Sequence, residues 1–133
     1  MSREVVVHTE LGHKFTQHVE VGPHRLRADE PTELAGEDLG PAPHDWVLAG
    51  LGACTSMTIK MYAERKGWPV ERVRVTLTHA HEGGTWIIQR GIELFGPLDE
   101  EQRKRLIEIA NKCPVHKSLS GPIRIDTAQR SPA

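Results

Sequence analysis

The most regular pattern of apolar positions lies between residues 43 and 67, and it predicts one long helix. Apolar or small residues recur there at spacings of three and four, which is typical of the face that a helix buries. Pro43 suits a first helical turn because its missing N–H leaves no donor unpaired, and Gly67 is a common kind of helix end. The predicted inward face runs through Val47, Leu51, Cys54, Thr58, Met61, Tyr62 and Arg65.

Two glycines, Gly50 and Gly52, interrupt this helix directly before a cysteine. A glycine inside a helix costs about 1 kcal/mol relative to alanine, so both positions need a compensating interaction. The missing side chains favour close approach, either of another helix or of a substrate. We therefore expect a core helix that carries Cys54 as a candidate reactive centre.

Segments in which apolar and polar residues alternate flank the helix and predict strands. The three before it form a meander, and the two after it form a hairpin that turns at Glu82-Gly83-Gly84. Their ranges are 4–9, 15–21, 24–28, 70–81 and 85–96.

A second helix is predicted to begin at Asp99, which with Gln102 has the form of a capping box. A short helical turn follows from Pro114, and a last strand covers residues 123–127. The resulting order, β-β-β-α-β-β-α-β, predicts an α+β fold with antiparallel sheets. The inward stripe of the second helix is Leu106, Ile109, Ala110 and Cys113.

The length and composition exclude several classes of protein. At 133 residues the chain is predicted to be one domain, residues 1–133, with a frayed tail at residues 128–133. The 17 Lys and Arg residues are balanced by 18 Asp and Glu, so no basic surface for nucleic acid is expected. No apolar run approaches the roughly 20 residues of a membrane span, and the start of the chain lacks the apolar part of a signal peptide. We therefore expect a cytoplasmic protein with neither a membrane nor a nucleic-acid partner.

The two cysteines are the candidates for chemistry. Without a secretion signal they are not expected to form a structural disulfide, so they are either buried inert thiols or a redox pair. Pro114 places Cys113 at the start of a helical turn, where free N–H groups lower a thiol's pKa, and His116 can add positive charge. Apolar neighbours in mid-helix raise the pKa of Cys54, so a reactive Cys54 needs a cation or a hydrogen-bond donor from elsewhere in the chain. The available candidates are Arg25, Arg27, Lys60 and His44.

Two motifs together resemble the OsmC/Ohr family, the osmotically inducible and organic hydroperoxide resistance proteins. The first is GPAPHD at residues 40–45 leading into LAGLGACT at residues 48–55, and the second is CPVHKSL at residues 113–119. Asp29-Glu30-Pro31 resembles the OsmC-like branch, and the order of elements agrees over nearly the whole chain. The resemblance implies antiparallel sheets around long central helices in an intertwined homodimer, with the active sites at the subunit interface.

The same resemblance implies thiol peroxidase activity with no metal and no bound organic cofactor. The family's peroxidatic role falls on Cys54, whose thiolate attacks the O–O bond of a hydroperoxide and becomes a sulfenic acid. Cys113 then resolves the sulfenic acid as a disulfide. A dithiol reductant restores both thiols, and family members often use lipoyl groups carried on proteins.

The chain departs from the family ahead of Cys54. Better characterised members carry a Glu ten residues before the peroxidatic cysteine, bonded to an Arg that supports the thiolate. Here that position is His44, followed by Asp45, and Arg25 is the candidate for the supporting arginine. Trp46 and His116 are the candidates for lining the pocket.

Two other interpretations stay open. One is a non-catalytic dimer of the same fold that binds a small apolar ligand or a partner protein in the interface cleft, and the replacement at His44 keeps it open. The weaker one is a zinc site built from the two cysteines and nearby histidines, although no close Cys-x-x-Cys pair is present. The histidines concerned are His44, His79, His81 and His116.

Overall fold

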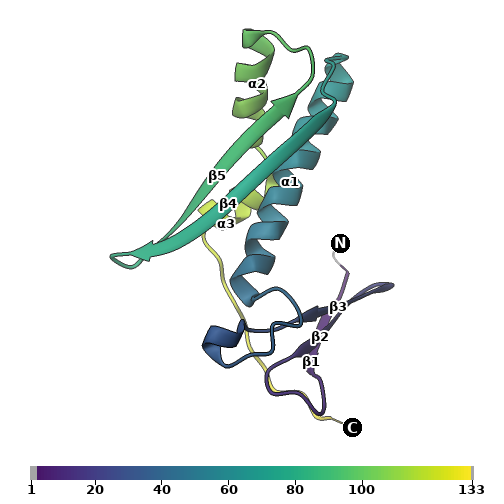
Figure 1. Cartoon of the computed structure of the whole chain (residues 1–133), viewed down its shortest axis with the longest axis vertical. Helices are drawn as coiled ribbons and strands as arrows, with labels where there is room; N and C mark the ends of the chain where they lie inside the picture. Colours follow the sequence, from purple (N-terminus) through teal and green to yellow (C-terminus); the bar gives the residue numbers. More distant parts are fainter. Residues whose placement is uncertain (1–2, 133) are drawn as a thin grey trace. The chain divides into compact units, whose positions relative to one another are not determined.

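The computed structural model describes residues 3–132, which combine helices with antiparallel sheets, as the sequence predicts (Figure 1). The chain divides between Ala49 and Gly50 into two compact units, and helix α1 belongs to both. The elements, in chain order, are β1 (Val5–Thr9), β2 (Gln17–Val21), β3 (His24–Ala28), the short 3-10 helix η1 (Thr32–Leu34), α1 (Pro43–Lys66), β4 (Arg72–Glu82), β5 (Thr85–Phe95), α2 (Glu100–Ala110) and α3 (Pro114–Ser120).

These elements confirm most of the predicted order, including the long helix, the meander, the hairpin and the capping box at Asp99. The last predicted strand, at residues 123–127, is wrong, because residues 122–132 form neither helix nor strand. A strand exists only when a neighbour pairs with its backbone, and the sheets of the described residues pair only β1 with β2, β2 with β3, and β4 with β5. Of the tail predicted to be frayed, Ala133 lies outside the described residues, as do Met1 and Ser2 of the predicted domain.

The first unit is built on the sheet β1-β2-β3, in which both pairs are antiparallel. Strand β2 lies in the middle and buries Val19, whereas the valines of β1 are exposed. Val5 is 62% exposed and Val7 is 54% exposed, so this sheet presents an apolar surface that the described chain leaves uncovered.

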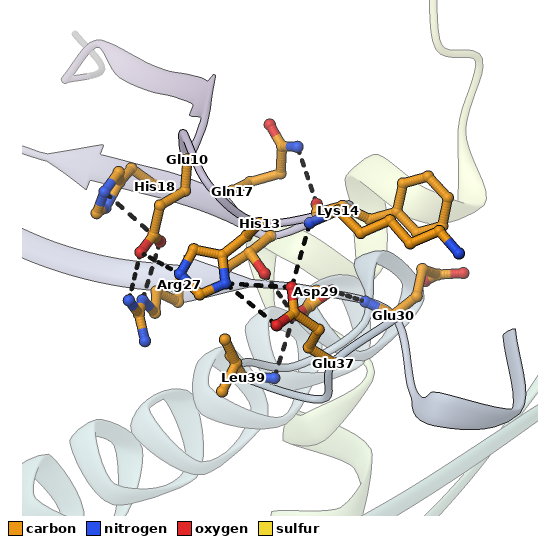
Figure 2. Close-up of polar contacts among 12 residues, drawn as sticks. Glu10, His13, Lys14, Gln17, His18, Arg27, Asp29, Glu30, Glu37 and Leu39 are labelled. Atoms are coloured by element: carbon orange, nitrogen blue, oxygen red, sulfur yellow. Dashed lines mark hydrogen bonds and ion pairs between the residues drawn. The ribbon is translucent and has the colours of Figure 1, made fainter. Parts of the chain in front are cut away.

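Asp29 anchors the irregular connection between β3 and α1 (Figure 2). Its buried carboxylate accepts hydrogen bonds from the Thr16 hydroxyl at 2.7 Å and from the backbone N–H groups of Glu30 at 2.8 Å and Leu39 at 3.2 Å. The Asp29 backbone N–H in turn donates to the Pro41 carbonyl. One side chain therefore ties both ends of the loop to Thr16, which directly precedes β2.

Glu10 is the centre of a second polar cluster in this unit (Figure 2). Its carboxylate pairs with the Arg27 guanidinium through two nitrogens, and it lies 3.5 Å from a ring nitrogen of His13 and 3.5 Å from one of His18. His13 also contacts Glu37 at 3.1 Å. The cluster accounts for two of the histidines in a chain that is rich in them.

The core of the second unit lies where α1, α2 and the β4–β5 hairpin meet (Figure 1). Ile59 and Ala63 of α1 face Leu106 and Ala110 of α2, and these four side chains are almost completely buried. The half-buried hydrophobic residues of the hairpin cover them. The stripe predicted for the second helix is confirmed in full, since Leu106, Ile109, Ala110 and Cys113 are all buried.

The inward face predicted for α1 is confirmed at Leu51, which is buried, and at Tyr62, which packs against the core, but the buried face as a whole is rotated from the predicted one. The buried positions of the helix are Leu48, Leu51, Gly52, Thr55, Ile59 and Ala63. Met61, which was expected inside, is 68% exposed, and Met57 is 63% exposed. The predicted face is rotated because the pattern gave weight to large apolar residues. In the structure the small Thr55 and Ala63 lie in the core, and the larger methionines are exposed.

The two helix glycines have different surroundings. A Cβ added at Gly52 would lie 2.8 Å from Cδ1 of Leu77 on β4, so this glycine admits close approach of a strand side chain. Apart from the adjacent residues and the helix's own backbone, no atom of the described chain lies within 4 Å of a Cβ added at Gly50. Close approach is therefore confirmed at Gly52, with a strand in place of the helix or substrate that was expected.

We expect Gly50→Ala to raise the free energy of unfolding by about 1 kcal/mol, because alanine favours the helix and meets no neighbour. Gly52→Ala should gain less, since Leu77 must move to admit the methyl group. Urea unfolding of the two variants beside wild type measures the difference. A loss of stability in Gly50→Ala would contradict the open surroundings of that residue.

Stability should also fall at low pH. Hydrogen bonding to Arg27 lowers the pKa of Glu10 below its ordinary 4.5, despite the opposing effect of burial. Burial raises the pKa of Asp29, but its hydrogen bonds outweigh this and hold the pKa below 3.8. Both carboxylates therefore stabilise the folded state above those ordinary values, and the contribution is lost as the pH falls through the lower folded-state pKa.

Asp29→Asn should consequently be less stable than wild type near neutral pH, and the difference should shrink in acid. Thermal unfolding at several pH values measures this, with the exposed Glu33→Gln as the matched control. A deficit in Asp29→Asn that does not change with pH would contradict the assignment.

Candidate functional site: a pair of thiols

The second unit brings Cys54 and Cys113 into hydrogen-bonding contact, and both are free thiols. Cys54 lies in the middle of α1 and is half-buried. Cys113 is completely buried, because it ends the inward stripe that begins with Leu106 of α2. The chain turns there, since Pro114 cannot continue α2 and instead occupies the first turn of α3.

Cys113 is the N-cap residue of α3, and its sulfur accepts a hydrogen bond from the backbone N–H of His116 at 3.3 Å. The Cys54 thiol and the backbone N–H of Val115 also donate toward it, and the Thr55 hydroxyl lies within reach of it. Burial raises the pKa of Cys113, but these hydrogen bonds outweigh burial and hold the pKa below the usual thiol value. The donors converge on one sulfur and stabilise its thiolate.

The surroundings of Cys54 act in the opposite direction. Burial raises the pKa of Cys54, and the hydrogen bond to Cys113 raises it further, because Cys54 is the donor in that contact. The N–H of Val115 and the Thr58 hydroxyl oppose this without reversing it. Both directions, lowered for Cys113 and raised for Cys54, agree with those expected from the sequence.

Two thiols in this contact titrate as a unit. When the first proton leaves, one thiolate forms, and the N-cap position favours that thiolate on Cys113. The remaining proton stays on Cys54, which donates it in a hydrogen bond to Cys113. The second proton leaves only at higher pH, because two negative sulfurs in contact repel each other. The pair therefore holds one negative charge between the first and the second ionisation.

Arg90 of β5 supplies a cation that the sequence analysis did not identify. One guanidinium nitrogen donates to the Thr55 hydroxyl oxygen at 3.0 Å, and the other donates to the Asn111 side-chain oxygen at 2.9 Å. The signal was present in the alternation of β5, where Arg90 shares a half-buried face with Ile88 and Ile92. A lone arginine on an otherwise apolar face requires a polar partner.

A hollow of about 490 Å³ lies over α1, β5 and α3 in the same unit. Its polar lining includes Arg90 and His116. Its apolar lining consists of Leu51, Trp86, Ile88, Leu119 and Ile123. Such a surface suits a ligand with a substantial apolar part.

The remaining predicted site residues belong to the first unit, and the structure gives each of them a local partner or position. Arg25 pairs with Glu20 at 3.2 Å and donates to the Gly22 carbonyl at 2.7 Å. In the first turn of α1, the Asp45 carboxylate accepts from the Ala42 N–H at 3.0 Å, and the Trp46 indole donates to the Pro41 carbonyl at 3.1 Å. His44 stands in the same turn. Support of the Cys54 thiolate by Arg25, His44 or Asp45, and a pocket role for Trp46, stay predictions.

Residues 3–132 contain no group of three or more His, Cys, Asp or Glu side chains arranged to hold a metal ion. Within the same range, no helix combines the length and the apolar character needed to cross a membrane.

The sequence model of the OsmC-like protein family matches residues 36–128. An OsmC-like protein from Mycoplasma pneumoniae is similar in structure, with 19% identity, a TM-score of 0.77, and coverage of 91% of this chain and 89% of that chain. An organic hydroperoxide resistance protein OsmC from Legionella pneumophila has 23% identity, a TM-score of 0.59, and coverage of 89% and 90%. The organic hydroperoxide resistance protein OhrB of Bacillus subtilis has 19% identity, a TM-score of 0.61, and coverage of 91% and 92%. No curated protein sequence matches the chain. At these identities the structural likeness concerns the fold alone.

We expect limiting iodoacetamide to alkylate Cys54 before Cys113, although the negative charge favours Cys113. Cys113 has no exposed surface, whereas Cys54 is half-buried and can reach its thiolate form by passing its proton to the neighbouring sulfur. Peptide mapping of partly alkylated protein measures the order. Earlier modification of Cys113 would contradict the difference in access.

Proposed function

This chain belongs to the OsmC-like protein family, and on that premise we propose that it is a thiol-dependent hydroperoxide reductase. Cys54 is the peroxidatic residue and Cys113 the resolving residue. The names of the Legionella and Bacillus proteins, which refer to organic hydroperoxide resistance, support the reaction class. The observation that carries the proposal is the contact between two free thiols of unequal access, one of them surrounded by donors.

In the first step, the half-buried Cys54 meets the hydroperoxide and passes its proton to the Cys113 thiolate. The Cys54 sulfur attacks the terminal oxygen, so that an S–O bond forms and the O–O bond breaks. The alkoxide that leaves takes the proton from Cys113 and departs as an alcohol. This step leaves Cys54 as a sulfenic acid and Cys113 again as a thiolate.

In the second step, the Cys113 thiolate attacks the sulfur of the Cys54 sulfenic acid. An S–S bond forms, the S–O bond breaks, and the hydroxide that leaves takes a proton from solvent to become water. The two cysteines have together lost two electrons and the hydroperoxide has gained them. The donors around Cys113 favour this step because they keep its sulfur ionised.

An external dithiol closes the cycle by thiol–disulfide exchange, which leaves the dithiol oxidised and both cysteines reduced. A lipoyl-type dithiol is our proposal for this reductant, and it rests on the family resemblance. No metal or organic cofactor takes part in either step, since sulfur carries both electrons.

We propose further that the chain works as a homodimer. The apolar side chains of β1 and the methionines on the outer face of α1 are exposed, and a second copy would cover them. We also propose that the protein works in the cytoplasm, because reductants there would keep its two cysteines as free thiols.

The apolar hollow favours organic hydroperoxides over hydrogen peroxide as substrates. Hydrogen peroxide has no apolar part to bury, whereas an organic substrate gains free energy from contact with side chains such as Leu51 and Ile88. The same hollow supports the alternative function, a non-catalytic module that binds a small apolar ligand, because its lining includes neither cysteine.

Treatment of the reduced protein with one equivalent of cumene hydroperoxide separates the two functions. We expect the intact mass to fall by about 2 Da as the Cys54–Cys113 disulfide forms. Cys113→Ser should stop at the sulfenic acid, which dimedone traps, and Cys54→Ser should not react. Hydrogen peroxide in a parallel series should react more slowly.

Persistence of both wild-type thiols under excess hydroperoxide would rule out the peroxidase and leave the binding module. Equal reaction of Cys54→Ser and wild type would show that the roles of the cysteines are wrongly assigned.

A further inference from the structure

Thr55 occupies a central position beside the thiol pair, and its side chain is completely buried. Its hydroxyl oxygen accepts a hydrogen bond from Arg90 at 3.0 Å. The same hydroxyl lies 2.7 Å from the carbonyl oxygen of Leu51, to which it donates, and within hydrogen-bonding reach of the Cys113 sulfur. One hydroxyl thus stands between the Arg90 guanidinium and a sulfur that gains and loses charge.

A hydroxyl has a single proton to donate. Arg90 occupies an acceptor site of the Thr55 oxygen, so the proton can serve either the Leu51 carbonyl or the Cys113 sulfur, but not both. The Leu51 carbonyl is a helix carbonyl and keeps its backbone partner in the next turn when the hydroxyl turns away. A thiolate is the stronger acceptor, because hydrogen bonds to charged groups are stronger than those to neutral groups.

We propose that Arg90 is a positioning residue for the thiol pair: it holds the Thr55 hydroxyl so that the hydroxyl donates to Cys113 whenever that sulfur is negatively charged. Arg90 is suited to this role because its planar fork donates from two nitrogens and is held at two points, by Thr55 and by Asn111. The contact with Asn111 orients the second arm of the fork. Asn111 caps α2 two residues before Cys113, so the same segment carries the anchor and the sulfur.

The proposal deepens the function given above and rests on it for its use in catalysis. Cys113 is a thiolate when it attacks the Cys54 sulfenic acid, and again when the reductant's attack on the disulfide expels it as the leaving group. In both steps a proton from Thr55 stabilises the sulfur without being transferred. The titratable and charged side chains that line the hollow on this side are Arg90 from β5 and His116 from α3.

The test is a pH titration of the reduced protein, followed by the ultraviolet absorbance of the thiolate. Thr55→Val removes the hydroxyl at nearly constant shape, and Arg90→Gln removes the charge. We expect each to raise the midpoint of the first thiol ionisation by about one pH unit. Thr55→Ser, which keeps a hydroxyl, should titrate like wild type.

The double variant Arg90→Gln/Thr55→Val distinguishes action through Thr55 from any other effect of the charge. We expect its midpoint to match that of Thr55→Val alone, because Arg90 has nothing left to position. Arg74→Gln, which removes an exposed arginine of β4 paired with Glu93, is the matched control and should leave the midpoint in place.

Equal shifts by Arg90→Gln in the wild-type and Thr55→Val backgrounds would overturn the proposal, as would an unshifted midpoint in either single variant. If Arg90→Gln fails to fold, the ionisation midpoints of Thr55→Val and Thr55→Ser are compared instead. A higher midpoint in Thr55→Val than in Thr55→Ser would show that the hydroxyl stabilises the thiolate. No hydroperoxide is present, so this titration can succeed where the peroxidase proposal fails. Formation of the disulfide with an unmoved midpoint would overturn the positioning role alone.

Discussion

The hydrogen bond between the Cys54 and Cys113 thiols is the interaction on which this account depends. It exists because two unrelated local features meet. The inward stripe of α2 carries Cys113 into the core, and Pro114 then breaks the helix so that the next turn aims its N–H groups at the sulfur. Helix α1 supplies the second thiol at a half-buried position. Without this contact, Cys113 would keep its other donors, whereas Cys54 would be a thiol whose pKa is raised by burial alone.

The contact also resolves an apparent conflict between charge and access. The donors favour the thiolate on Cys113, yet that sulfur is completely buried and the more accessible one is Cys54. A shared proton removes the conflict, because negative charge stabilised at one sulfur can be used at the other. The accessible sulfur meets the substrate, and the buried sulfur holds the charge until it is needed to form the disulfide.

Much of the fold was predictable because its signals are local. The capping box at Asp99, the turn at Gly83-Gly84 and the proline after Cys113 each determine their own segment, and all three are confirmed. The strand predicted at residues 123–127 failed because alternation cannot show whether a pairing partner exists. The face of α1 was misjudged because small residues such as Thr55 and Ala63 carry little pattern, although they are the ones that the core admits.

The site was predictable only in part, for the same reason. The opposite pKa directions of the cysteines follow from a helix start and a mid-helix position, which the sequence shows. The supporting cation cannot be predicted from such local signals. Arg90 and Thr55 are 35 residues apart in the chain, and only the packing of β5 on α1 brings them into contact. The two arginines that the sequence suggested have local partners instead, since Arg25 pairs with Glu20 and Arg27 pairs with Glu10.

The most direct test of the central claim is the complete thiol titration of the reduced wild-type protein. If the two sulfurs share one proton, ionisation occurs in two well-separated steps, the first below and the second above the usual thiol value, with one thiolate per chain between them. Replacement of Cys54 by alanine should raise the first midpoint, because Cys113 loses a donor. Two independent thiols that titrate together near the usual value, in wild type and variant alike, would contradict the account.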